Sequence, residues 1–157
     1  MKKFEEQMQE LVVILANRNL TIAAAESCTG GAFMSALVSV PGVSEVLAGG
    51  VVAYSEDTKV KQLGVASDTI QRYGIVSKQV AGEMAAGVRN MFGTDIGVGV
   101  TGFAGPSGER VGEVCFGVDF CGEVTTFDKR FERLARKMVI HQSVVCLADK
   151  LFVELSK

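Results

Sequence analysis

Residues 20–40, LTIAAAESCTGGAFMSALVSV, place an apolar run directly before a polar, glycine-containing segment and a second apolar stretch. The run Leu20–Ala25 has no helical stripe, so it predicts a buried strand. Ala32–Val40 predicts a helix, because apolar residues dominate it and a Pro-Gly pair follows it. This order of strand, tight turn and helix places the polar turn Glu26–Gly31 at the end of a buried strand, where α/β proteins carry binding and catalytic groups.

The rest of the chain repeats this alternation of helices and strands. Further helices are predicted at about 3–17, 55–63, 77–91 and 132–155, and further strands at 46–54, 95–101, 111–120 and 123–131. Ser55, Ser67 and Ser77 are the candidate N-caps. Asp95–Thr101 alternates Gly with Ile and Val, which predicts a buried strand that its neighbours approach closely. These elements predict a single α/β domain over residues 1–157, with helices on both faces of a mixed sheet.

Composition narrows the classes of function. The 157 residues are 48% hydrophobic and 22% charged, which excludes a disordered or fibrous chain. A net charge of −2 gives no basic surface for nucleic acid, so a small-molecule partner is favoured. Four cysteines without a CxxC pair and one histidine offer no zinc set, so no metal centre is expected.

The N-terminal residues indicate the cellular compartment in which we expect the protein. Met1–Leu20 lacks the pattern of a signal peptide, and every apolar stretch is far shorter than the roughly 20 residues that span a bilayer. We therefore expect a cytoplasmic protein with reduced thiols and no membrane contact.

The turn Glu26–Gly31 offers two nucleophiles, Ser27 and Cys28. A side chain there lies at the end of the sheet, and the N–H groups that begin the following helix can hold an oxyanion. The same residues also suit an ordinary surface turn. Cysteine enzymes usually pair the thiol with histidine, but the spacing of His141 indicates a packed residue on the last helix. A Ser-His-Asp triad requires that helix to reach the turn, whereas serine activated by lysine needs no histidine.

Two further loops follow predicted strands. Tyr54 and Lys59 lie at the end of one strand and in the helix after it, and lysine acts as a base only where its pKa falls toward neutrality. A solvated helix lysine is the alternative, and composition does not distinguish Lys61 from Lys59. The segment Thr101–Gly108, TGFAGPSG, can expose backbone N–H groups to an anion or form a plain turn. It matches neither a Walker loop nor a dinucleotide fingerprint.

Taken in order, these segments resemble a known family. The strings AESCTGG, GGVVAYSEDTK, YGIVS, VAGEMAAGV and VGVTGFAGPSG are similar to the C-terminal domain of the competence/damage-inducible protein CinA. The resemblance runs from about residue 4 to 155. Stand-alone versions of that domain are nicotinamide-nucleotide amidohydrolases, so it implies an α/β/α sandwich that deamidates nicotinamide mononucleotide to nicotinate mononucleotide and ammonia, without metal or cofactor. The oligomeric state stays open, a homo-oligomer included.

The resemblance also implies roles for particular residues. Ser27 matches the family's nucleophile, Lys59 its general base and Tyr54 the hydroxyl that assists between them. The substrate side is matched by two glycine-containing turns, made of Thr29, Gly30 and Gly31 and of Thr101, Gly102 and the residues through Gly105.

Two stretches depart from the family's pattern. Only four residues, 107–110, separate Pro106 from Val111 where relatives carry a longer loop. Near the end, FDKRFERLARK replaces a Gly-Asp-Arg motif, so Arg136 matches the later arginine of the family and Arg133 or Arg130 stands for the earlier one. Arginines here are natural phosphate ligands. A nucleotide-binding or regulatory paralogue without turnover is the rival interpretation.

Overall fold

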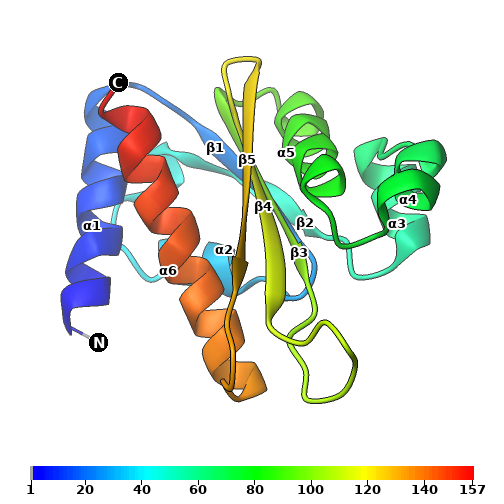
Figure 1. Ribbon diagram of the computed structural model, residues 1–157. Coiled ribbons are helices and arrows are strands. Elements are labelled where there is room, and N and C mark those ends of the chain that lie inside the picture. The colour runs from blue at the N-terminus through cyan, green and yellow to red at the C-terminus, as the bar shows by residue number, and fades with distance from the viewer. Residues whose placement is uncertain (1) are drawn as a thin grey trace.

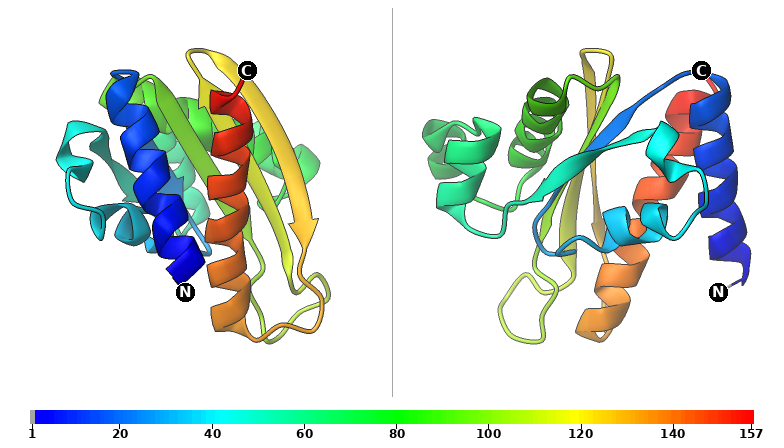
Figure 2. Two further views of the ribbon diagram at one scale, coloured as in Figure 1. Left: turned by 90° about the vertical axis from the view of Figure 1, so that its left-hand side faces the viewer. Right: turned by 180° about the vertical axis from the view of Figure 1, so that it is seen from behind.

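The computed structural model describes residues 2–157, in which five strands form one sheet with helices on both faces (Figure 1). The strands are β1 (Ile22–Glu26), β2 (Leu47–Val52), β3 (Ile96–Gly102), β4 (Glu113–Phe120) and β5 (Glu123–Arg130). The helices are α1 (Lys2–Asn17), α2 (Ala32–Val38), α3 (Glu56–Leu63), α4 (Ser67–Tyr73), α5 (Lys78–Phe92) and α6 (Arg136–Leu155), with a 3₁₀ turn at Val43–Glu45. Helices α1, α2 and α6 cover one face and α3, α4 and α5 the other (Figures 1 and 2), which confirms the predicted three-layer α/β/α sandwich.

The sheet order is β2-β1-β3-β4-β5. Strands β2, β1 and β3 run parallel, and β4 and β5 are antiparallel to their neighbours, so the sheet is mixed as predicted. Because parallel strands end at the same edge, the segments after β1, β2 and β3 meet there. The chain goes from β1 to β2 on one side and then crosses to β3 on the other, and binding crevices form at such reversals of strand order.

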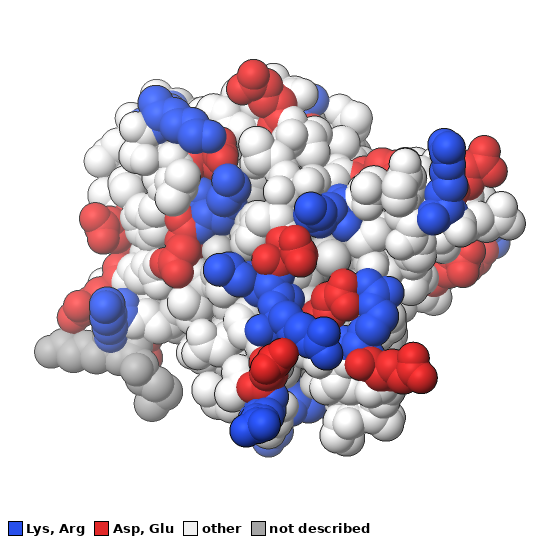
Figure 3. Space-filling model, viewed as in Figure 1, with Lys and Arg blue, Asp and Glu red and all other residues white. Residues whose placement is uncertain are grey.

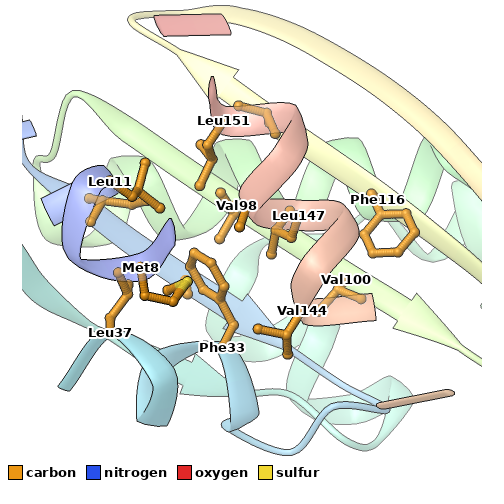
Figure 4. Close-up of a cluster of buried hydrophobic side chains, with 14 of the residues drawn as sticks. Met8, Leu11, Phe33, Leu37, Val98, Val100, Phe116, Val144, Leu147 and Leu151 are labelled. Carbon is orange, nitrogen blue, oxygen red and sulfur yellow. The ribbon is translucent and has the colours of Figure 1, made fainter. Parts of the chain in front are cut away.

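The main core lies between the sheet and α1, α2 and α6 (Figure 4). Phe33 of α2 and Phe116 of β4 are fully buried in it, together with Leu11, Leu147 and Leu151 of the two long helices. Each such side chain contributes about 1.5 to 3 kcal/mol when it leaves water. This packing holds α2, and therefore the turn before it, against the carboxyl end of β1.

The opposite face shows why glycines alternate in β3. A Cβ on Gly97 would lie 2.2 Å from the carbonyl oxygen of Ala85, and one on Gly99 would lie 2.4 Å from that of Ala81. Helix α5 thus packs with its backbone almost directly on the strand, and the predicted close approach is confirmed.

Two predicted helix starts are wrong. Ser55 and Ser77 cap α3 and α5 as expected, but Ser67 is the first residue of α4 and Ala66 takes the cap position. The last helix begins at Arg136 and not at Glu132, because its cap residue, Ala135, offers no side-chain acceptor that would mark the start. Within residues 2–157, no helix combines the length and apolarity needed to cross a bilayer.

Candidate active site

A cavity of about 310 Å³ opens at the carboxyl ends of β1, β2 and β3. It is lined by Ser27, Cys28, Tyr54, Lys59, Ile75, Val76, Thr101, Gly102, Phe103, Ala104, Gly105, Ser107 and Arg136. The three loops that the sequence singles out therefore meet at one site, together with the first residue of α6.

Glu26 organises the turn that carries Ser27. Its side chain is fully buried, and its two carboxylate oxygens accept hydrogen bonds from the N–H groups of Phe33 (2.9 Å) and Met34 (3.0 Å) at the start of α2. The helix N-terminus has no side-chain cap of its own at Gly31, so Glu26 supplies the negative charge that its dipole favours.

This arrangement corrects the expectation that the first N–H groups of the helix hold an oxyanion. Those of Phe33 and Met34 are bound to Glu26, and that of Ala32 donates to the carbonyl of Thr29. In the described part of the chain, the N–H groups of Cys28 and Thr29 donate to no backbone carbonyl and remain as candidate oxyanion donors.

Glu26→Gln is expected to lower the free energy of unfolding by about 1 to 3 kcal/mol, because an amide offers one acceptor where two buried N–H groups need two. Urea titration of the purified variant measures this loss. The matched control is Glu6→Gln on the exposed side of α1, for which no change beyond about 0.5 kcal/mol is expected. A Glu26→Gln protein as stable as the wild type would contradict this role of the carboxylate.

Ser27 and Lys59 are in direct contact. Lys59 Nζ lies 2.9 Å from Ser27 Oγ and donates a second hydrogen bond to the carbonyl oxygen of Ala53 (2.8 Å). The lysine is 1% exposed, and burial lowers its pKa from 10.5 although Cys28 and Glu56 act in the opposite direction. Its place follows from the Ser55 cap, which begins α3 one turn earlier. An amine fixed beside a hydroxyl and biased toward its neutral form can act as a general base.

The two other candidate groups for nucleophilic chemistry lack such an arrangement. Burial raises the pKa of the Cys28 thiol to about 12, so Cys28 stays a protonated thiol near neutral pH. His141 packs edge-to-face on Phe4, 5.1 Å between ring centroids, on α6 and away from the cavity lining. The packed interpretation of the histidine is confirmed, and Ser27 has lysine as its partner.

Tyr54 and Arg136 meet at the cavity. Arg136 donates one hydrogen bond to Tyr54 Oη (2.9 Å) and another to the carbonyl oxygen of Gly105. The guanidinium group thereby joins the segment after β2 to the loop after β3. Tyr54 is 61% exposed and its hydroxyl contacts the arginine, so an assisting role between Ser27 and Lys59 stays a prediction.

The remaining predicted substrate-side residues fall into two groups. Thr101, Gly102 and Gly105 line the cavity, and Thr101 Oγ1 donates to the carbonyl oxygen of Ile75 (3.1 Å). The others do not line it: Thr29, Gly30 and Gly31 lie in the turn beyond Ser27, while Arg130 and Arg133 lie outside the cavity. Thr29 Oγ1 is buried and finds no hydrogen-bond partner among residues 2–157.

Sequence reasoning missed three residues that shape the site. Ile75 and Val76 line the cavity from the α4–α5 connection, and nothing in their apolar sequence marks them as site residues. The capping role of Glu26 did leave a signal, because no Ser, Thr, Asp or Asn stands directly before the predicted helix at Ala32. In the described residues, no three His, Cys, Asp or Glu side chains gather as metal ligands would.

Comparisons with known proteins extend the resemblance. The CinA C-terminal domain family model matches residues 4–152. A CinA-like protein of Dictyoglomus thermophilum is 40% identical over 148 residues, which are 91% of this chain and 36% of that protein. The chain spans about a quarter to a third of the length of such curated relatives.

Solved structures match over nearly the whole chain. A CinA superfamily protein from Klebsiella pneumoniae has a TM-score of 0.94 and 29% identity, with 98% of both chains covered. A competence or damage-inducible protein from Enterobacter asburiae has a TM-score of 0.93 and 32% identity, with 97% of this chain and 98% of that chain covered. With the family model matching from Phe4 to Phe152 and the fold reproduced throughout, this chain belongs to the CinA C-terminal domain family.

Proposed function

We propose that the protein hydrolyses the carboxamide of nicotinamide mononucleotide to nicotinate mononucleotide and ammonia, through an acyl-enzyme on Ser27. The observation that carries this proposal is the 2.9 Å contact between Ser27 Oγ and the buried Lys59 Nζ inside the cavity. The similarity to stand-alone amidohydrolases supplies the substrate, because serine and lysine alone specify only acyl transfer.

The first half-reaction forms the acyl-enzyme. Neutral Lys59 keeps its hydrogen bond to Ala53 and uses its lone pair to accept the proton of Ser27 as Oγ attacks the carboxamide carbon. The tetrahedral intermediate places negative charge on the amide oxygen, which the N–H group of Cys28, at the cavity wall, stabilises. Lys59 then returns the proton to the amide nitrogen, the C–N bond breaks and ammonia leaves.

The second half-reaction reverses these roles. Water enters the position that ammonia vacated, and Lys59 accepts its proton as the oxygen attacks the ester. Collapse of the second tetrahedral intermediate returns the proton to Ser27 Oγ and releases the carboxylic acid, which loses its remaining proton to solvent. Every proton transfer uses one amine, which burial keeps close to the hydroxyl and away from solvent.

The rate of ammonia release is expected to rise with pH, because only neutral Lys59 accepts the proton of Ser27. Burial lowers the lysine pKa, so the midpoint of this rise lies below 10.5. The unfolded chain binds more protons than the folded one between the lowered pKa and 10.5, so folding stability also rises with pH across that window. A pH–rate profile and urea titrations across that window measure both effects. A Lys59→Met protein whose stability rises equally steeply with pH would contradict the assignment to Lys59.

Arg136 is the basic side chain that lines the cavity from α6, and we assign it to the phosphate of the nucleotide. Arg136→Ala should raise the dissociation constant of nicotinamide mononucleotide about ten- to a hundredfold, since a charge-assisted contact is worth about 1.5 to 3 kcal/mol. The nucleoside, which lacks the phosphate, should bind wild type and variant alike. Calorimetric titration measures both ligands.

Arg133→Ala is the matched control, because Arg133 lies outside the cavity lining and its loss should change neither affinity. Equal weakening of nucleotide and nucleoside by Arg136→Ala would mean that the arginine acts through Tyr54 and Gly105 and that the phosphate lies elsewhere.

The experiment that tests the proposed function is an assay of both products from one incubation. Purified protein with nicotinamide mononucleotide should release one ammonia for each nicotinate mononucleotide. A protein that binds the nucleotide and releases no ammonia would overturn the proposal and favour the regulatory paralogue.

A further inference from the structure

Strand β5 forms a long, regular edge of the sheet. Six of its eight residues are exposed, and its pairing with β4 runs without a bulge from Glu123 to Arg130. It also contains no proline. The opposite edge strand, β2, is shorter, and a shift interrupts its register with β1. Proline, bulges, short strands and charged side chains are the usual protection of an edge. Of these β5 has only the charged side chains, so its free N–H and C=O groups are available to a strand whose own charges are complementary.

The pairing of β4 with β3 and with β5 determines which backbone groups of β5 point away from the sheet. The N–H of Cys121 donates to the carbonyl of Asp95 on the β3 side, so odd-numbered residues of β4 direct their backbone groups toward β3 and even-numbered ones toward β5. Even-numbered β4 residues pair with odd-numbered β5 residues. The outward groups of β5 therefore belong to Val124, Thr126, Asp128 and Arg130.

This alternation restricts how two copies of β5 can pair about a twofold axis. Residues whose N–H and C=O groups point outward must pair with residues of the same kind. All of these residues have even numbers, so the twofold axis passes through a residue and not between two residues. An axis at Asp128 sets two like charges directly opposite each other, which is unfavourable. An axis at Phe127 or Thr125 leaves every charged side chain opposite an uncharged one.

Among the axes that set no like charges opposite each other, only the one at Thr126 matches opposite charges. It sets Glu123 opposite Lys129 of the second copy, and by symmetry the reverse, in the narrow pairs where side chains lie closest. Neither residue forms an ion pair within the described chain. On the face where β5 runs down the front of the molecule, acidic and basic side chains lie interspersed (Figures 1 and 3).

We propose that two copies of this chain associate through β5, by antiparallel pairing about a twofold axis at Thr126, with reciprocal Glu123–Lys129 ion pairs. The sheet then continues from one copy into the other. The pairing involves little more than one strand from each copy, which places it among the small, weak and transient interfaces. Its two ion pairs make it sensitive to salt.

Sedimentation equilibrium across protein concentration tests the pairing. Glu123→Lys and Lys129→Glu each set like charges opposite each other twice and should weaken the dimer about tenfold. The double variant restores both pairs in reversed polarity and should return to within about threefold of the wild type. Glu6→Lys on the exposed side of α1 makes the same charge reversal away from β5 and should leave the dissociation constant unchanged. A wild type that stays monomeric at every concentration, or a double variant as weak as the single ones, would overturn the proposal.

Amide hydrogen exchange provides a readout that requires no variant. Odd-numbered residues of β5 donate within the sheet of one copy and are protected at any concentration. The N–H groups of Thr126 and Asp128 should gain protection only as concentration rises through the dissociation constant. Exchange at these two amides that does not depend on concentration would contradict the pairing, whatever other contact the molecule makes.

Discussion

Replacing Ser27 by alanine is expected to reduce ammonia release from nicotinamide mononucleotide by at least about 10⁴-fold, since removal of a catalytic nucleophile eliminates the covalent route. The variant should still bind the nucleotide, because Thr101, Gly105 and Arg136 keep their places around the cavity. It should also keep the wild-type melting temperature within a few degrees. Steady-state assays, calorimetry and thermal unfolding of the same preparation measure these three quantities.

Cys28→Ala is the matched control in the same turn. Cys28 is 6% exposed and its thiol stays protonated near neutral pH, so loss of the thiol should lower stability by about 1 kcal/mol or more and leave activity within about tenfold of the wild type. A Ser27→Ala protein with near wild-type turnover, or a Cys28→Ala protein as inactive as Ser27→Ala, would contradict the assignment of the nucleophile.

Replacing Lys59 by methionine should cause the second largest loss of activity. The same change should make the folded protein more stable. Methionine fills a similar volume but accepts no proton, so turnover should fall by about 10³-fold or more. In the described part of the chain, no carboxylate lies within ion-pair distance of Lys59, so the folded protein bears the cost of a buried amine. Its removal should raise the free energy of unfolding by about 1 to 3 kcal/mol.

Lys61→Met, two residues further along α3, separates these effects from general electrostatics. Lys61 is exposed and pairs with Asp57 at 3.1 Å, a contact worth only a few tenths of a kcal/mol. Activity and stability should both stay close to the wild type. Equal losses of activity at positions 59 and 61 would show that positive charge, and not proton transfer, is what the reaction needs.

The sequence predicts much of this fold because the decisive elements carry local signals. The apolar run before Glu26, the glycine alternation of Asp95–Thr101 and the Ser55 and Ser77 caps each specify an element without reference to the rest of the chain. Since parallel strands end at one edge, the same reasoning also predicts that the loops after these strands meet. Ser27, Lys59 and Thr101 accordingly line one cavity.

What the sequence does not predict depends on contacts between distant segments. The start of α6 carries no capping side chain, so Glu132–Ala135 had the composition of a helix but lies outside it. Arg136 reaches Tyr54 across 82 positions of the chain, and no spacing rule expresses such a contact. Lys59 and Lys61 are the same type of residue, two positions apart in the chain. Only the fold distinguishes the buried amine of Lys59 from the solvated amine of Lys61.

Trapping with hydroxylamine tests the central claim, an acyl-enzyme on Ser27, most directly. Hydroxylamine is small enough to follow water into the cavity and attacks an ester more readily than water does. The account predicts that the hydroxamate of the nucleotide forms at the expense of nicotinate mononucleotide, that each acyl transfer still releases one ammonia, and that Ser27→Ala gives neither product. Nicotinate mononucleotide formed by the wild type with no hydroxamate at any hydroxylamine concentration would contradict it, because water would then attack the amide without an acyl-enzyme.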